Sequence, residues 1–202
     1  MSAVGADQLP VGLVLAGGES RRMGRDKALL AWGDTDLLGH ALRRLAAVTS
    51  EQMILSGARA RHTGRGVAVV TDPAQGALAA VAAGLAAAGG RPVLVLAVDV
   101  PLVTSALLGR LVELLPGHDA VVPVSARGDE PLSAVYGPAC LDAMRRRLAA
   151  GQHAMTAFWP DVRLRRVAPE ELEAFGDPEQ LFLNVNTDDA YARAAARRTS
   201  AC

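Results

Sequence analysis

The segment from Leu15 to Lys27 has the residue types of a phosphate-binding loop. It follows a short apolar run and contains three glycines, Gly17, Gly18 and Gly24. Because glycine has no Cβ, backbone N–H groups at such positions can approach a phosphate closely. Four cationic side chains against two acidic ones give the segment a local positive excess. We therefore interpret it as a binding site for a polyphosphate.

The spacing of the glycines excludes the common phosphate-binding motifs. Walker A has four residues between its glycines and then Lys and Ser or Thr, whereas Gly18 and Gly24 bracket five residues. The pattern Gly-x-Gly-x-x-Gly does not occur in the chain. Both a P-loop ATPase and a dinucleotide-binding dehydrogenase thus lose their main support. A solvated basic turn remains the alternative interpretation.

Short apolar runs alternate with helical patterns and predict the elements that must position this loop. One helix is expected over 37–48, capped by Thr35 or Asp36, and another over 106–115, capped by Thr104. Strands separated by helices of this length predict a three-layer α/β/α Rossmann-like fold with a mostly parallel sheet. The runs that suit buried strands are 11–16, 52–56, 67–71, 93–98 and 120–124.

The pattern loosens after about residue 125. Strands over 132–136 and 162–167 flank a helix over 139–150, so an antiparallel or mixed part of the sheet is expected there. A final helix is expected to open at Thr187 and to run to about residue 197. We predict one domain over 1–202, with a nucleotide-binding half over about 1–124 and an acceptor-side half over about 125–198.

The composition excludes several classes of partner. Lys plus Arg and Asp plus Glu both count 21, so no global field attracts nucleic acid or a membrane surface. Aromatic residues make up 3%, which leaves few stacking platforms for bases. The uncharged stretch 73–90 is interpreted as a buried helix, because it is too weakly hydrophobic for a membrane span. Cys140 and Cys202 form no disulfide or metal pattern, and no signal segment is apparent, which favours a cytoplasmic location.

Six short motifs are spread over the chain. They are Leu-Ala-Gly-Gly at 15–18, Arg-Met-Gly at 22–24, Asp-Lys at 26–27, Asp72, Asp-Val-Pro at 99–101 and Asn-Val-Asn-Thr at 184–187. With these motifs the sequence resembles the molybdenum cofactor guanylyltransferases (MobA), within the wider nucleotidyltransferase superfamily. The resemblance extends over essentially the whole chain, and the first loop combined with the segment 184–187 is more specific than the loop alone.

Asp99 is the candidate metal ligand. It follows the apolar run 93–98, so its carboxylate is expected at the ligand-binding edge of the sheet, where Mg²⁺ prefers one or two carboxylates plus phosphate oxygens. The resemblance makes it the family's magnesium aspartate, and a turn-capping Asp is the alternative. Lys27 and Arg21 are the expected catalytic cations, ahead of Arg22. The expected nucleotide-binding residues are Leu15, Ala16, Gly17, Gly18, Arg22, Gly24, Lys27, Ser56, Asp72 and Asp99.

The chain departs from the family pattern on the nucleoside side. Ser56 or Gly57 stands where the family has an asparagine, and the segment 76–78 lacks the family's proline. Asp72 is expected to contact the nucleoside half, with a turn-forming Asp-Pro as the alternative. By resemblance, Gly18 in Leu-Ala-Gly-Gly goes with guanine rather than cytosine. GTP is therefore the expected nucleotide.

Asn184 and Asn186 are the expected acceptor-binding residues. They occupy alternate positions of an extended run, so their amides share one face. Capping of the final helix by Asn186 or Thr187 is the alternative. The four histidines are scattered, and we assign chemistry to none of them.

The resemblance implies transfer of GMP from GTP to the phosphate of molybdenum-loaded molybdopterin, with Mg²⁺ as cofactor and pyrophosphate as the leaving group. A phosphate nucleophile is already anionic, so no general base is needed. Molybdenum-insertion proteins and molybdoenzyme maturation chaperones are further candidate partners. The alternatives are a CTP-dependent molybdopterin cytidylyltransferase, a sugar-phosphate nucleotidyltransferase and a non-catalytic nucleotide-binding module.

Overall fold

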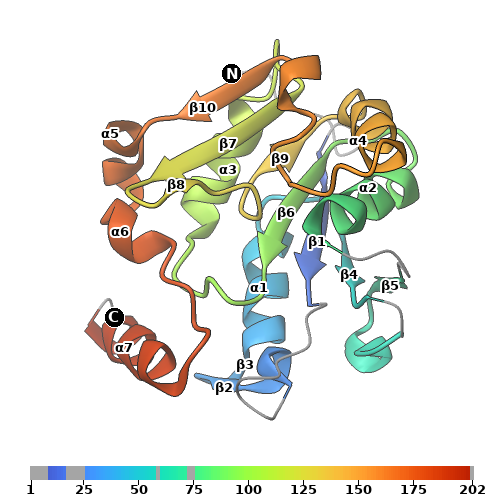
Figure 1. The fold of residues 1–202 in the computed structure, drawn as a ribbon. Coiled ribbons are helices and arrows are strands. Elements are labelled where there is room, and N and C mark those ends of the chain that lie inside the picture. The colour runs from blue at the N-terminus through green and yellow to red at the C-terminus, as the bar shows by residue number, and fades with distance from the viewer. Residues whose placement is uncertain (1–8, 17–25, 58–59, 72–75, 201–202) are drawn as a thin grey trace.

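The structure is a computed structural model that describes residues 9–16, 26–57, 60–71 and 76–200. These residues form a central sheet with helices on both faces (Figure 1). The strand order is β10-β7-β9-β6-β1-β4-β5, and β8 pairs with β7 outside this path. The strands are β1 Val11–Leu15, β4 Glu51–Leu55, β5 Ala68–Val70, β6 Val93–Ala97, β7 Ala120–Ser125, β8 Gly128–Asp129, β9 Val135–Tyr136 and β10 Leu164–Val167.

The predicted parallel part of the sheet is confirmed. Strand β1 lies between β4 and β6 and is parallel to both, and β5 continues the parallel order beyond β4. All residues of β1 and β6 are buried, as expected for strands that helices cover on both faces.

The C-terminal part of the sheet is mixed, as predicted. Strand β9 is antiparallel to both β6 and β7, whereas β10 is parallel to β7. The regular ladder of β9 is shorter than the predicted strand 132–136. Even so, Ala97 N–H donates to the Leu132 carbonyl and Val95 N–H to that of Ala134, both at 2.8 Å, so the pairing continues upstream of β9.

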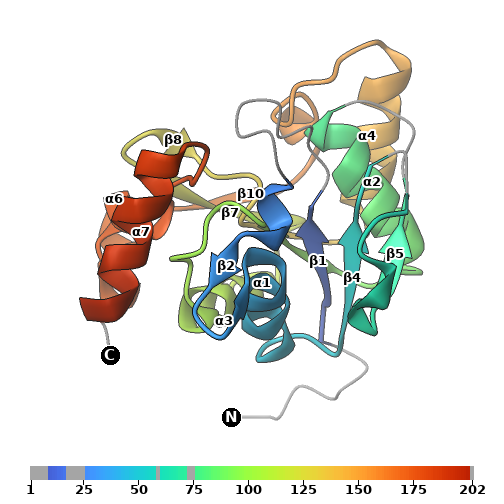
Figure 2. The ribbon, with the colours of Figure 1, turned by 90° about the horizontal axis from the view of Figure 1, so that it is seen from below.

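Helices cover both faces of the sheet and make the predicted three layers. Helices α1 (Leu37–Ala46) and α3 (Ser105–Glu113) lie on one face, and α2 (Ala77–Ala87) and α4 (Cys140–Ala149) lie on the other (Figure 2). Two hydrophobic clusters, one on each face, bury the corresponding side chains. Helix α2 is the buried helix expected within 73–90. In the described residues, no helix is long and apolar enough to span a membrane.

The caps of the helices follow the sequence closely. The Asp36 side chain accepts from Gly39 N–H at 2.8 Å at the start of α1, and Thr104 accepts from Leu107 N–H at 3.2 Å at the start of α3. Each cap satisfies an N–H group that the first helical turn leaves without an intrahelical partner.

Several short elements were not predicted. A 3-10 helix, η2 (Lys27–Leu29), leads into a hairpin of β2 (Ala31–Trp32) and β3 (Thr35–Asp36). The C-terminal part contains α5 (Pro169–Leu172) and α6 (Pro178–Leu181) before the final helix α7 (Asp188–Ser200). Further 3-10 turns are η3 (Thr63–Arg65), η4 (Trp159–Asp161) and η5 (Glu173–Phe175).

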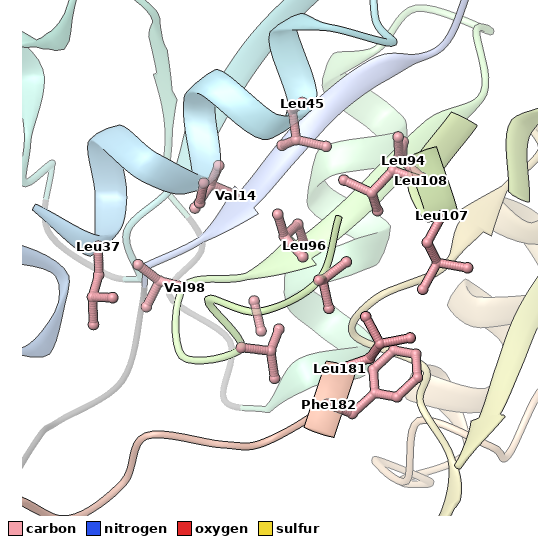
Figure 3. Close-up of a cluster of buried hydrophobic side chains, with 14 of the residues drawn as sticks. Val14, Leu37, Leu45, Leu94, Leu96, Val98, Leu107, Leu108, Leu181 and Phe182 are labelled. Carbon is pink, nitrogen blue, oxygen red and sulfur yellow. The ribbon is translucent and has the colours of Figure 1, made fainter. Parts of the chain in front are cut away.

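The C-terminal segment is anchored in the core beside α1 and α3. Leu181 and Phe182 pack into the same cluster as Val14, Leu96 and Leu107 (Figure 3). Further along, the Tyr191 hydroxyl of α7 donates to the Ala31 carbonyl, and its ring meets that of Trp32 edge-on with centroids 5.9 Å apart. The C-terminal third of the chain thus packs against the N-terminal third.

We expect Gly84→Ala to destabilise the fold. A Cβ at this position of α2 would lie 2.3 Å from Leu13 Cδ2, and Leu13 is fully buried in β1. Overpacking of about 1–3 kcal/mol should outweigh the gain in helix propensity of about 1 kcal/mol. Chemical denaturation of the purified variant measures the difference in free energy of unfolding.

Gly109→Ala in α3 is the matched control. Its Cβ would meet only Val48 Cγ1 at 3.4 Å, an ordinary contact, so the propensity gain should leave this variant as stable as the parent or more stable. Equal or greater stability of Gly84→Ala would contradict the packing argument.

Candidate active site

The carboxyl ends of the parallel strands meet at one edge of the sheet. Leu15 at the end of β1 is in register with Leu55 of β4 and with Ala97 of β6, and Leu55 is in register with Val70 of β5. Just beyond β1, Ala16 N–H donates to the Leu55 carbonyl at 2.9 Å. The segments that leave these strands therefore emerge side by side, where open α/β sheets bind their ligands.

Part of the predicted site lies outside the described residues. Leu15 and Ala16 are described and lead to this edge. The loop residues Gly17, Gly18, Arg21, Arg22 and Gly24 are not described, and neither is Asp72, which follows β5. Their roles stay predictions.

The structure brings Lys27 and Asp99 together. Asp26 caps η2 by accepting from Ala28 N–H at 3.0 Å, which orients the helical turn that carries Lys27. Asp99 follows the end of β6, as expected. The Lys27 Nζ lies 3.2 Å from Asp99 Oδ2, and the two side chains are 15% and 21% exposed. The ion pair is thus mostly shielded from solvent yet reachable from it.

The two predicted acceptor residues occupy different environments. Lys27 also donates to Asn186 Oδ1. Asn184 Oδ1 is buried, and no hydrogen-bond partner for it is present in the described part of the chain. Thr187 Oγ1 accepts from Ala190 N–H at 3.2 Å. Of the two capping candidates, Thr187 thus caps α7, and the Asn186 carbonyl contacts the lysine.

The backbone also joins the C-terminal segment to the site. Val185 N–H donates to the Asp99 carbonyl at 2.8 Å, and the Val185 side chain is fully buried. Val185 thus lies between two asparagines of different exposure, the partly buried Asn184 and the exposed Asn186.

Glu130 is a neighbour of the site that we did not identify from the sequence. The Ser125 hydroxyl donates to its Oε1 at 2.7 Å. Burial raises the pKa of the Glu130 carboxyl, and the negative charge of Asp99 raises it further, while the Ser125 hydrogen bond and the Arg127 charge act against this. An isolated glutamate in a loosely patterned segment gives no signal of this proximity.

Ser56 lies at the same edge of the sheet, directly after β4. It is 5% exposed, and its Oγ accepts from Arg61 N–H at 3.2 Å. The hydroxyl thus holds the Arg61 backbone beside the end of β4. Because this hydrogen bond satisfies the buried hydroxyl, the burial of Ser56 does not by itself indicate a ligand contact.

His62 is a second residue to which we assigned no chemistry. Its Nε2 lies 3.6 Å from Asp26 Oδ2, and its side chain is 4% exposed. The residue has a φ of 62°, in the left-handed region that only a few non-glycine residues adopt. His62 therefore links the segment after β4 to the residue that precedes Lys27.

The described residues contain no group of three or more metal-binding side chains. What the edge offers instead is a carboxylate with a cation beside it and an amide oxygen on that cation. An arrangement of this kind suits electrostatic stabilisation of bound phosphates, which contribute oxygen ligands of their own.

We expect Glu130→Gln to stabilise the fold at neutral pH. The folded-state pKa of Glu130 is raised above the usual 4.5, so the ionised carboxylate opposes folding at pH 7 and the protonated form does not. The advantage of the variant should therefore be present at pH 7 and shrink as the pH falls toward 4.5. Urea denaturation at several pH values measures it.

Asp119→Asn is a control with the opposite sign. Hydrogen bonds from the Arg163 side chain and backbone lower the pKa of Asp119 below 3.8. This variant should be less stable than the parent at pH 7, with a difference that shrinks as the pH falls through the folded-state pKa. Loss of stability in both variants at pH 7 would contradict the assignment for Glu130.

A family model described as the MobA-like NTP transferase domain matches residues 12–167 of the chain. Among curated proteins, a probable molybdenum cofactor guanylyltransferase of Pelotomaculum thermopropionicum is 35% identical over 185 residues, which cover 91% of this chain and 90% of the relative.

Solved structures with the same fold agree with this match. The molybdopterin-guanine dinucleotide biosynthesis protein A of Archaeoglobus fulgidus has a TM-score of 0.79 at 23% identity, with 94% of this chain and 99% of that chain covered. A Mycobacterium tuberculosis protein in complex with manganese has a TM-score of 0.64 at 24% identity, with 93% and 98% covered. Since the family model spans most of the sequence and the curated relative covers nearly all of it, the chain belongs to the MobA-like NTP transferase family.

Proposed function

We propose that this nucleotidyltransferase transfers GMP from GTP to the terminal phosphate of molybdenum-loaded molybdopterin. An oxygen of the acceptor phosphate forms a bond to the α-phosphorus, the bond from the α-phosphorus to the bridging oxygen of the β-phosphate breaks, and pyrophosphate leaves. The observation that carries the proposal is the Lys27–Asp99 pair at the edge of the sheet, in a chain 35% identical to a probable molybdenum cofactor guanylyltransferase.

The roles of Lys27, Arg21 and Asp99 follow from the charges of the reactants. Two anions must approach each other, so cations are needed more than a general base. Lys27 binds the phosphates as a point charge, and Arg21 offers a planar fork for two phosphate oxygens. Among the described histidines, His40 Nε2 lies 2.9 Å from the Pro101 carbonyl oxygen and His118 Nδ1 lies 3.1 Å from that of Leu114, so their hydrogen bonds serve the fold.

The chemistry of the edge fits a divalent metal ion. The Asp99 carboxylate is partly exposed and forms an ion pair with Lys27. Its negative charge also raises the pKa of a second carboxyl group, that of Glu130. Mg²⁺ is the ion that we propose for Asp99, where it would neutralise charge on the α-phosphate and on the departing pyrophosphate. A protein of the same fold has been solved in complex with manganese, which supports a divalent ion as the cofactor.

The remaining nucleotide and acceptor contacts are proposed from the sequence. Leu15, Ala16, Gly17, Gly18, Arg22, Gly24, Ser56 and Asp72 contribute to the nucleotide site, and Gly18 favours guanine. Asn184, whose carbonyl oxygen has no partner in the described residues, is proposed to bind the acceptor.

We propose a single domain, with a nucleotide-binding half over about 1–124 and an acceptor-side half over about 125–198. Both hydrophobic clusters contain residues from both halves, which supports one folding unit. A cytoplasmic reaction is proposed, since GTP is the donor and Cys140 is a buried free thiol. Molybdenum-insertion proteins and molybdoenzyme maturation chaperones are proposed to supply the acceptor and receive the product.

An assay of pyrophosphate release tests the nucleotide and the acceptor separately. GTP and CTP are each combined with molybdopterin or with a sugar phosphate in the presence of Mg²⁺. We expect turnover with GTP and molybdopterin, and much slower turnover with CTP. Faster pyrophosphate release with CTP than with GTP would identify a cytidylyltransferase. Release with a sugar phosphate but not with molybdopterin would refute the proposed acceptor. If none of the acceptors gives any release, the proposed transferase activity is refuted.

Asp99→Asn tests the metal-binding carboxylate. The change removes a charge and keeps the size of the side chain, so kcat should fall by about a hundredfold or more, with a higher Mg²⁺ requirement. Asp142→Asn is the matched control, because the Asp142 side chain is 81% exposed on α4, and its kcat should equal that of the parent. An unchanged kcat and Mg²⁺ requirement in Asp99→Asn would remove this residue from the mechanism.

A further inference from the structure

Lys27 is held by groups from two distant parts of the chain. Its Nζ donates to Asp99 Oδ2 after β6 and to Asn186 Oδ1 just before α7. The Lys27 side chain is 15% exposed. Since an ammonium on a flexible four-carbon stem has many positions open to it, two acceptors restrict its direction.

The Asn186 amide reaches this position because the segment around it is fixed on both sides. Upstream, Leu181 and Phe182 are buried in the core (Figure 3), and Val185 is buried and bonded through its N–H to the Asp99 carbonyl. Downstream, Thr187 rather than Asn186 caps α7. The side-chain amide oxygen of Asn186 is therefore not needed to accept a hydrogen bond from an N–H group at the start of α7.

The lysine side of the contact is fixed by the same part of the chain. Tyr191 of α7 donates to the Ala31 carbonyl and packs on Trp32, both in the hairpin that follows η2. The turn that carries Lys27 and the segment that carries Asn186 thus form one connected unit.

The chemical type of the contact matters as much as its position. An amide oxygen accepts a hydrogen bond from an ammonium without adding charge, whereas a second carboxylate beside Asp99 would give the group around Lys27 a net negative charge. Asn186 therefore restricts the direction of the Lys27 ammonium without adding a negative charge that would repel an anionic ligand.

We propose that Asn186 is a positioning residue for the nucleotide: its amide oxygen orients the Lys27 ammonium toward the triphosphate. This assignment rests on the proposed function, and it replaces the acceptor contact expected of Asn186 from the sequence. It makes the affinity for GTP depend on a residue of the acceptor-side half even when no acceptor is bound.

Binding of a fluorescent GTP analogue to the full chain, with Mg²⁺ and without acceptor, tests the assignment. We expect Asn186→Ala to weaken binding by about tenfold, the usual effect of losing a hydrogen bond to a charged group. Asn186→Asp should bind more weakly still, because a second carboxylate beside Asp99 leaves a net negative charge around Lys27 and repels the triphosphate. Asp142→Asn, the exposed control on α4, should keep the GTP affinity of the parent.

A double-mutant cycle separates positioning from a general effect on folding. In a Lys27→Met background, Asn186→Ala should change the GTP affinity by less than about twofold, because the group that it orients is gone. In turnover, Asn186→Ala should raise the KM for GTP and leave the KM for the acceptor unchanged. Thermal melting of each variant verifies that it is folded, and Asn186→Ser serves if the alanine variant is not.

The outcomes distinguish this inference from the proposed function. If the parent binds GTP and Asn186→Ala binds it equally well, or if Asn186→Ala raises only the acceptor KM, the positioning role is wrong and the transferase stands. An additive effect in the Lys27→Met background also overturns it. A parent that binds no GTP overturns the proposed function and this inference together.

Discussion

Placing one ammonium beside a carboxylate and a neutral amide oxygen is the constraint on which the rest of this structure depends. Lys27 and Asp99 lie 3.2 Å apart at a partly exposed edge, where a pair of opposite charges is worth more than in open water. An isolated surface pair of this kind contributes little to stability. Its value lies in the fixed position of the ammonium, because a reaction between two anions needs a cation at a defined place.

The architecture meets this constraint by placing distant segments on neighbouring strands. Strand β1 leads to the turn that carries Lys27, and β6, its direct neighbour, leads to Asp99. Both strands are fully buried, so their register is set by the packing of helices on both faces. The C-terminal segment also lies at this edge, because Leu181 and Phe182 are buried in the hydrophobic cluster on the face of the sheet that α1 and α3 cover.

Local signals in the sequence predicted much of this arrangement. The apolar runs of the parallel strands, the caps Asp36 and Thr104, and the position of Asp99 after a buried strand all depend on residues close together in the chain, and each is found in the structure. The hairpin of β2 and β3 could not be predicted, because strands of two residues have no periodicity.

The long-range contacts of the site were beyond sequence reasoning for a different reason. The Lys27–Asn186 contact joins residues 159 positions apart, and nothing in the Asn-Val-Asn-Thr pattern distinguishes an amide that faces a lysine from one that faces a ligand. The same holds for Glu130, which is close enough to Asp99 in the folded chain for the negative charge of Asp99 to raise its pKa. His62 and Asp26 are likewise distant in the sequence and adjacent only in the folded chain.

The reversed direction of β9 affects which residues can lie at the ligand-binding edge of the sheet. In a wholly parallel sheet, only residues that leave a strand reach the carboxyl edge, and each crossover must then travel back behind a helix. Since β9 runs against β6 and β7, the residues that arrive at it, including Glu130 and Leu132, lie at that edge as well. One inverted strand thus brings residues that precede a strand, as well as residues that follow one, to the ligand-binding edge of the sheet.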